Sequence, residues 1–222
     1  METVASQMTV EQMTPSGQVL EQTDVVWRIC LPVLTTGDQV VMREVRASDA
    51  APLFAALTAP EVARFISPPP ATVQEFEHFI AWNIRQRETG AGACFAVTLK
   101  GFDTAIGIFQ VRSLDADFRT AEWGFALGSA FWGTGVFRAS AELVLQFIFT
   151  TLGVHRLEAR SMVQNGRGNR AVQKVGGVQE GVLRKAFFRD GKYHDQVLHS
   201  IMADDWQASR RRAGPVRYAR VH

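Results

Sequence analysis

Hydrophobic and polar positions along the chain follow two periods, and each period predicts one kind of element. Runs in which apolar and polar residues alternate, or in which β-branched and aromatic residues gather between turn signals, predict strands. These runs cover residues 26–34, 39–45, 94–99, 105–111, 121–127, 154–162, 178–187 and 193–202. Short polar loops separate the three runs between 94 and 127, which predicts an antiparallel meander in the middle of a sheet.

Helical spacing is found in four other segments, which cover residues 49–57, 72–88, 135–151 and 166–175. Asp49 is the expected N-cap of the first helix, and Gly176-Gly177 is the expected end of the last. The second helix opens with Thr72-Val73-Gln74-Glu75, a capping box in which the first and last residues satisfy each other's end amides. Polar residues recur at every fourth position of the third helix, so most of its surface is expected to contact other parts of the protein.

Together these elements predict an α+β (mixed α/β) fold, with a central, mostly antiparallel twisted sheet of about seven strands flanked by helices. At 222 residues the chain suits one large domain. We expect this domain to cover residues 26–206. A polar, flexible leader over residues 1–25 precedes it, and a basic, arginine-rich tail over residues 207–222 follows it.

Composition and charge argue against several classes of protein. A hydrophobic share of 46% and a charged share of 21% suit a globular protein with a real core, and a formal charge of +2 gives no argument for a nucleic-acid partner. The basic tail is interpreted as a solvated end rather than a nucleic-acid arm. No run approaches the ~18 apolar residues of a membrane span, and no secretory signal pattern is present. Cys30 and Cys94 form no metal or disulfide pattern, so we expect a cytoplasmic protein without a metal.

The segment from Thr120 to Arg138 has the pattern of a strand, a glycine turn and the start of a helix. Gly133 and Gly135 lie at the turn, so several backbone N–H groups would point outward at the helix N-terminus. The first four amides of a helix have no internal partner and the helix dipole favours negative charge there, so the turn predicts a phosphate site. The turn does not match two common phosphate-binding motifs. Arg138 stands where a dinucleotide fingerprint needs its third glycine, and the Gly-Lys-Ser/Thr of a Walker loop does not follow.

Further motifs lie before and after this turn in a recognisable order. They are Glu122-Trp123-Gly124-Phe125-Ala126-Leu127, Phe131-Trp132-Gly133-Thr134-Gly135, Leu152-Gly153-Val154-His155-Arg156-Leu157-Glu158-Ala159-Arg160 with Asn165 after it, Glu180-Gly181-Val182-Leu183-Arg184, and Asp190-Gly191-Lys192-Tyr193-His194-Asp195. This series resembles the GNAT superfamily of acyl-CoA-dependent N-acetyltransferases, in particular the branch of ribosomal-protein N-terminal acetyltransferases (RimJ/RimL-like). The resemblance covers residues 38–206 and is firmest from residue 120 onward.

The resemblance implies the GNAT fold, with a sheet splayed between its fourth and fifth strands, and acetyl-CoA (coenzyme A) as co-substrate. The pantetheine arm would lie along the backbone of Phe125, Ala126 and Leu127. One amide near Phe125 or Ala126 would polarise the acetyl carbonyl and stabilise the tetrahedral oxyanion. The pyrophosphate would bind the turn and the helix start, where Arg138 adds charge. The residues assigned to this part are Trp132, Gly133, Thr134, Gly135, Val136, Phe137 and Arg138.

The implied reaction is direct acetyl transfer to a primary amine in a ternary complex. The amine must be neutral to attack, so a base has to remove a proton, and Glu122 is the carboxylate on the family's fourth strand. The alternative for Glu122 is a salt bridge with Arg119 or Arg160. Asn165 matches the family's asparagine that contacts the pantetheine, and it could also cap the next helix.

Three positions depart from the family's pattern. Phe137 stands where a small residue is usual, and it would either narrow the pyrophosphate site or pack into the core. Arg138-Ala139 replaces a usual Thr-Glu pair. Gly168 replaces a serine thought to help protonate the departing thiolate, which leaves bulk water or Tyr193 as the acid. The departures at Phe137 and Gly168 favour the alternative of a non-catalytic acyl-CoA-binding or regulatory domain.

The acceptor is expected to be a protein or peptide N-terminus or a small-molecule amine. Residues 60–90 are expected to form one wall of its pocket, and Tyr193 and His194 are candidate substrate contacts. Adjacent side chains on a strand point to opposite faces, so a His194–Asp195 catalytic couple is not expected. We expect a monomer or homodimer without a nucleic-acid or membrane partner.

Overall fold

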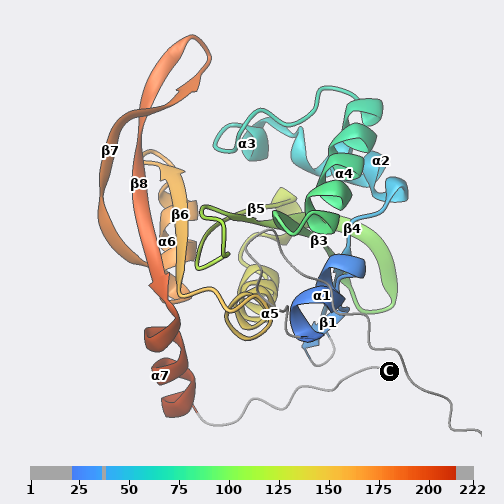
Figure 1. The fold of residues 1–222 in the computed structure, drawn as a ribbon. Coiled ribbons are helices and arrows are strands. Elements are labelled where there is room, and N and C mark those ends of the chain that lie inside the picture. The colour runs from blue at the N-terminus through green and yellow to red at the C-terminus, as the bar shows by residue number, and fades with distance from the viewer. Residues whose placement is uncertain (1–21, 37–38, 214–222) are drawn as a thin grey trace, which may run out of the picture.

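The computed structural model describes residues 22–36 and 39–213, which form one open eight-stranded sheet with helices on both faces (Figure 1). The strands lie in the order β1-β2-β3-β4-β5-β6-β8-β7. Their bounds are β1 Leu34–Thr36, β2 Val40–Glu44, β3 Gly92–Leu99, β4 Phe102–Ser113, β5 Thr120–Leu127, β6 Arg156–Met162, β7 Val178–Arg189 and β8 Lys192–Met202. The predicted fold class is confirmed, with one strand more than expected.

The helices lie between these strands or follow them. They are α1 Gln22–Ile29, α2 Ala50–Leu57, α3 Pro60–Ala63, α4 Val73–Glu88, α5 Val136–Thr150, α6 Gly166–Lys174 and α7 Ala203–Ala213, with short 3-10 turns at Ala47–Asp49 and Ser129–Phe131. Most of the predicted leader and the end of the predicted tail lie outside the described residues. The division of the chain into leader, domain and tail stays a prediction.

The sheet is open between β5 and β6, the two strands that run parallel. They pair only at their first residues, Thr120–Glu122 opposite Arg156–Glu158. Beyond this point β5 remains paired with β4, and β6 remains paired with β8. The facing edges of β5 and β6 therefore separate toward their carboxyl ends, which confirms the expected splay.

Hydrophobic cores on both faces of the sheet hold β3 to β5 in place. α5 covers one face, where the Phe147 ring lies 5.1 Å from the Phe95 ring. α2 and α4 cover the other face, and Phe76 and Ile80 of α4 are each 1% exposed there. Figure 1 shows α5 and the pair α2 and α4 on opposite sides of these strands. β5 is thus fixed from both faces at the place where its outer edge becomes free.

The strand expected over residues 26–34 is wrong, since α1 occupies the first part of this segment. Trp27 and Leu31 lie four residues apart and are 4% and 3% exposed. The Trp27 ring packs edge-on against Phe118 at 5.9 Å. Ile29, which a strand would bury together with Trp27 and Leu31, is 71% exposed, so the alternation of a strand is absent here.

Asp49 precedes α2 as expected, but its side chain does not cap that helix. The carboxylate is almost fully buried and accepts two hydrogen bonds from Arg43, each 2.8 Å long, and a third of 2.8 Å from the Arg46 amide. Donation to the Asp49 carboxylate raises the pKa of the Arg43 guanidinium above its ordinary value. A buried carboxylate forms a stronger, bidentate pair with a guanidinium than with the amides of a helix end, so Asp49 binds Arg43 instead of capping α2.

The predicted capping box of α4 is half confirmed. The Thr72 hydroxyl accepts a hydrogen bond of 3.1 Å from the Glu75 amide. The Glu75 carboxylate accepts at 2.6 Å from the Ala71 amide, which lies one residue before the expected partner.

Candidate active site

Two cavities flank the opening between β5 and β6. The first, which we call the sheet-face cavity, measures about 850 Å³ and lies over the face of β4 and β5 that α4 covers. The second, which we call the helix-end cavity, measures about 1160 Å³ and lies at the N-terminal ends of α5 and α6. The two cavities meet at the opening, because both are lined by Phe65, Ile66, Phe125, Ala126, Asn165 and Gly168.

β5 presents different side chains to its two faces, as the alternation of a strand requires. The Phe125 ring packs on the α5 side, 5.5 Å from the Phe109 ring and 4.6 Å from the Phe137 ring. The residues on the other face line the sheet-face cavity, and they are Glu122, Gly124 and Ala126. Gly124 leaves this wall open, because a Cβ at its position would meet no atom within 4 Å.

The predicted glycine turn forms one end of the helix-end cavity. Gly133 and Gly135 have φ angles of 79° and 91°, a conformation that side chains beyond glycine rarely adopt. Gly135 is the N-cap of α5, so the unpaired amides of the first helical turn lie beside the cavity. Two residues assigned to this site do not line the cavity. The Thr134 hydroxyl donates to the Phe131 carbonyl at 2.8 Å, and Val136 is buried in the core.

The two departures at the start of α5 differ in what they do. Phe137 packs into the core, with its ring 4.6 Å from Phe125 and 5.9 Å from Phe109, and it also borders the helix-end cavity. Arg138 is 75% exposed, pairs with Glu142 at 3.0 Å and lines the same cavity. The bulky ring therefore supports β5, while the charged side chain stays at the surface.

The rim of the helix-end cavity carries a surplus of positive charge. Its charged lining residues are Arg64, Arg138, Arg167, Arg170 and Lys174 against the single acid Glu61. The hydrogen bond that Ser129 donates to Glu61, 2.7 Å long, holds the pKa of that carboxyl below its ordinary value. Arg167 stacks over Trp132, with its guanidinium carbon 4.0 Å from the ring centroid.

Of these cations only Arg138 was predicted from the sequence. Arg64 comes from a loop more than seventy residues earlier, and its place beside the turn depends on the tertiary fold. A signal for the others was present in α6. Arg167, Arg170 and Lys174 lie at positions i, i+3 and i+7, which share one face of a helix.

Asn165 lies at the junction of the two cavities and caps α6. Its Oδ1 accepts a hydrogen bond of 2.9 Å from the Gly168 amide, which confirms the capping role. Gly168 leaves room for this arrangement. A Cβ at position 168 would lie 2.9 Å from Asn165 Cγ and closer still to Nδ2. A serine at position 168 would collide with Asn165 in its present orientation, so the two residues depend on each other.

Glu122 lines the sheet-face cavity in a row of charged side chains that crosses the opening. Its carboxylate accepts a hydrogen bond of 2.9 Å from Arg112 Nε, and Arg160 Nε lies 3.9 Å away. Arg160 also pairs with Glu158 at 3.0 Å. The expected pairing with Arg160 is therefore present, but Arg112 is the closer partner. Sequence reasoning missed Arg112 because only the register of β4 and β5 places it opposite Glu122.

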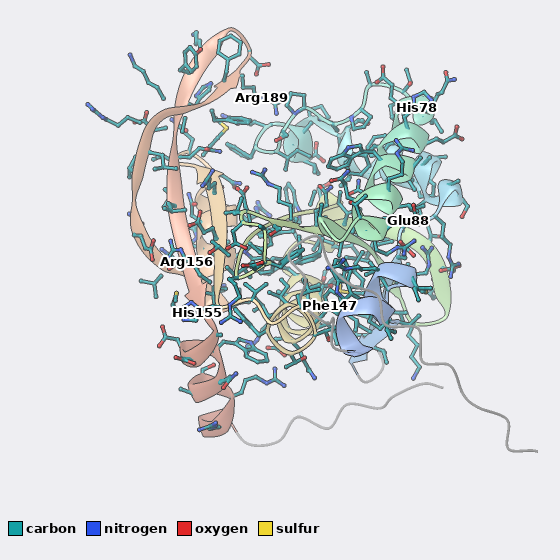
Figure 2. All side chains as sticks on the ribbon, in the orientation of Figure 1. His78, Glu88, Phe147, His155, Arg156 and Arg189 are labelled. Atoms are coloured by element: carbon teal, nitrogen blue, oxygen red, sulfur yellow. The ribbon has the colours of Figure 1, made fainter. Side chains whose placement is uncertain are left out.

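Segments from both halves of the chain enclose the sheet-face cavity. One wall consists of α4 and residues 65–70, within the range expected to form it. The opposite wall includes Ala186 and Phe187 of β7. Arg189 donates a hydrogen bond to the Ile66 carbonyl, and Figure 2 shows Arg189 projecting from the β7–β8 hairpin toward the α3 segment. The two walls are thereby tied together.

Tyr193 and His194 line neither cavity. Tyr193 is 65% exposed near the end of the hairpin, where its ring lies 4.9 Å from Phe188. Asp195 has a structural role, since its Oδ1 accepts at 2.8 Å from the amide of Lys185, a bulge residue of β7 with a φ of 52°. A substrate contact by Tyr193 or His194 stays a prediction.

Within residues 22–36 and 39–213 no cluster of His, Cys, Asp and Glu side chains could hold a metal ion. No helix in this part of the chain is long and apolar enough to cross a membrane.

The site combines an open parallel strand pair, a glycine turn at a helix end with a basic rim, and a second cavity behind the opening. A phosphate-bearing ligand suits the turn and its cations. The acetyltransferase (GNAT) domain family matches residues 39–178, and the chain belongs to this family. It is a GNAT N-acetyltransferase that uses acetyl-CoA as co-substrate. Catalytic acetyl transfer is thus supported over the non-catalytic alternative.

Individual proteins agree with this assignment. The chain is 26% identical over 185 residues to the uncharacterized N-acetyltransferase YoaA of Bacillus subtilis, a match that covers 77% of this chain and 97% of YoaA. It is 28% identical over 90 residues to spermidine N(1)-acetyltransferase of Vibrio cholerae, covering 40% and 52% of the two chains. The structure of RimL, a ribosomal alpha-N-protein acetyltransferase in complex with coenzyme A, has the same fold, with a TM-score of 0.71 and 16% identity over 78% of this chain and 99% of that chain.

Proposed function

We propose that the enzyme transfers the acetyl group of acetyl-CoA to a primary amine by direct attack in a ternary complex. The meeting of the two cavities at the β5–β6 opening carries this proposal. The donor would occupy the helix-end cavity and the acceptor the sheet-face cavity, so both could be bound at once. Phe125, Ala126 and Asn165 line both cavities and mark the place where the reacting groups would meet.

The residues of the helix-end cavity suit the chemistry of coenzyme A. Its phosphates would face the turn amides after Gly133 and the surrounding cations. Its pantetheine arm would pass along the free edge of β5. The Ala126 backbone groups face β4, and the Leu127 carbonyl already accepts a hydrogen bond of 3.0 Å from the Trp132 indole. Backbone pairing with the arm would therefore use Phe125 and the Leu127 amide.

Glu122 is the base that we propose for the amine. Only Glu75 and Glu122 bring carboxylates to the sheet-face cavity among the residues that the structure describes, and the Glu75 carboxylate is held by the Ala71 amide. Arg112 and Arg160 hold Glu122 against the cavity wall. Because its carboxylate is engaged there, we propose that Glu122 takes the proton through a water molecule rather than by direct contact.

The group that protonates the thiolate of coenzyme A is proposed to be water. Gly168 brings no hydroxyl, and Tyr193 lies outside both cavities near the hairpin end. The role that the family gives to a serine would therefore have no side chain to perform it at position 168.

The proposed acceptor is a peptide or protein N-terminus, with a small-molecule amine as the second candidate. Charges that line the sheet-face cavity are balanced, with Arg112 and Arg160 against Glu75 and Glu122. A polyamine carries several positive charges and would need a surplus of acids, whereas an N-terminus carries one charge near the reacting atom. RimL bears the name of a protein N-terminal acetyltransferase, and the Vibrio cholerae relative that of a spermidine acetyltransferase. We further propose a cytoplasmic monomer or homodimer without nucleic-acid or membrane partners.

Release of free thiol from acetyl-CoA tests the proposal across a panel of peptides, polyamines and aminoglycosides. A peptide with a free N-terminus should be turned over, and the same peptide with a blocked N-terminus should not. Double-reciprocal plots against both substrates should intersect, because both are bound before transfer. Parallel lines would contradict direct transfer, and turnover confined to polyamines would contradict the preferred acceptor.

A further inference from the structure

We infer that Gln110 orients the attacking amine and makes the enzyme selective for primary over secondary amines. The inference rests on the proposed acetyl transfer in the sheet-face cavity, which Gln110 lines from β4.

The side-chain amide of Asn83 on α4 is buried and has one possible orientation. Asn83 is 5% exposed, and its Nδ2 donates to the Phe79 carbonyl at 2.9 Å. A carbonyl only accepts hydrogen bonds, so the Asn83 atom that faces Phe79 has to be the nitrogen. The Asn83 Oδ1 therefore faces the cavity side, toward β4.

The orientation of Asn83 determines that of Gln110. Asn83 Oδ1 accepts a hydrogen bond of 2.9 Å from Gln110 Nε2. The Gln110 amide cannot reverse, because two carbonyl oxygens would then face each other. Its Oε1 accepts no hydrogen bond from the residues that the structure describes. Gln110 thus brings an acceptor atom of fixed orientation to the cavity wall, while one N–H of its amide is held by Asn83.

The position of Gln110 on the sheet places this acceptor near the reaction. Gln110 pairs with Gly124 of β5, whose missing side chain leaves open space on the cavity side. Residues two positions apart on a strand share a face, so Glu122 and Ala126 lie on either side of Gly124. Gln110 therefore lies one strand back from the opening, at a level along the sheet between the proposed base and Ala126.

A neutral primary amine matches two acceptors at this place. It has two N–H donors and one lone pair. Gln110 Oε1 would accept one N–H, and Glu122 or its water would accept the other, which leaves the lone pair free to attack the thioester carbon. The C–N bond forms and the C–S bond breaks. The nitrogen gives up one proton toward Glu122, and the departing thiolate takes a proton from water. The hydroxide left by that water is neutralised by the proton on Glu122, which restores both groups. A secondary amine has a single N–H and leaves one acceptor unpaired.

The test compares a peptide acceptor from the panel with the same peptide methylated at its terminal nitrogen. Gln110→Met keeps the length of the side chain and removes both polar atoms. It should lower kcat/KM for the primary amine about tenfold and change the rate for the methylated peptide little, so that the preference shrinks. Acetyl-CoA should stabilise the variant as it does the wild type, which shows that the fold and the donor site are intact. Gln110→Ala serves as a second variant if the methionine fits poorly.

Two further variants separate orientation from general packing. Asn83→Leu leaves Gln110 in place but frees its amide to rotate, so the preference should fall by about threefold. Gln173→Met makes the same chemical change on α6 outside both cavities and should leave rate and preference unchanged.

The outcomes distinguish this inference from the proposed function. If both Gln110 variants keep the wild-type rate and preference, the role of Gln110 is wrong and acetyl transfer stands. If the wild type binds acetyl-CoA but transfers to no amine, the proposed function is wrong and the inference fails with it.

Discussion

Trp132 and Arg167 meet across the helix-end cavity, with the guanidinium carbon 4.0 Å from the indole ring centroid. Trp132 follows β5, and Arg167 lies in the first turn of α6 after β6. Their contact therefore bridges the two strands that separate at the opening. A ligand whose phosphates bind the turn would lie against this pair.

Arg167→Ala should weaken acetyl-CoA binding about five- to tenfold, because it removes a cation from the basic rim and the stack on Trp132. The rate at saturating acetyl-CoA should change less than about twofold. Titration of the intrinsic tryptophan fluorescence with CoA measures the affinity. Arg85→Ala, on α4 outside both cavities, is the matched control. Tighter binding by Arg167→Ala would mean that the stack obstructs the site instead.

Glu122→Gln should lower kcat on the order of a hundredfold, because it removes the proposed base while keeping the shape of the side chain. The acetyl-CoA affinity should stay within about twofold of the wild type, since Glu122 lines only the sheet-face cavity. The pH–rate profile is the decisive measurement. A pH–rate profile in the variant with the same shape as that of the wild type would remove Glu122 from this role.

Gly168→Ala should lower Tm by about 2–4 °C and also slow the reaction, because the new methyl group displaces the Asn165 side chain from its capping position. Gly166→Ala is the control for stability. A Cβ at position 166 would touch only Arg170 Nη2, at 3.9 Å, which is an ordinary contact. Equal Tm values for the two variants would show that the Asn165–Gly168 contact contributes little.

His199 should make the folded protein less stable in mild acid. It is fully buried on β8, and neither ring nitrogen has a hydrogen-bond partner among the described residues. Burial lowers its pKa below the ordinary value of 6.5. Below that pH the unfolded chain binds a proton that the folded chain does not, so the free energy of unfolding should fall until the folded-state pKa is reached.

Urea unfolding at about pH 7.5 and about pH 5.5 measures this effect. His199→Leu should lose less stability over this interval than the wild type, because it cannot take up the proton. An equal loss in both proteins would assign the acid sensitivity to other groups.

Much of the fold could be predicted because local patterns and tertiary packing favour the same structure. The meander from β3 to β5 lies between two cores, so its apolar runs mark the strands to within a few residues. α4 ends at Glu88 as its helical period predicts. The strand expected over residues 26–34 is wrong because the apolar residues of α1 fit both periods: Val25, Trp27 and Ile29 alternate, while Val25, Val26 and Ile29 have helical spacing. Only the exposure of Ile29 beside the buried Trp27 reveals which period applies.

The residues of the candidate site likewise divide into those that local sequence predicts and those that only the tertiary fold brings into place. The glycine turn and the Asn165 cap depend on residues close together in sequence, so both could be predicted. Arg112, Gln110 and Asn83 gain their positions from strand register and from a helix packed on the sheet. No local pattern carries that information. The exposure of Tyr193 likewise follows from how far the hairpin extends past the sheet.

The two faces of β5 separate two properties of the enzyme within a single strand: the stability of the fold and the range of substrates. Aromatic positions such as Phe125 secure the scaffold, while Glu122, Gly124 and Ala126 line the sheet-face cavity, the proposed place of the acceptor. Substitutions on the second face can change substrate range with little loss of folding, and a duplicated gene could drift to a new amine by that route. The same separation makes Gly124, where an added Cβ would meet no atom within 4 Å, the natural position to vary when engineering an acetyltransferase for a chosen acceptor.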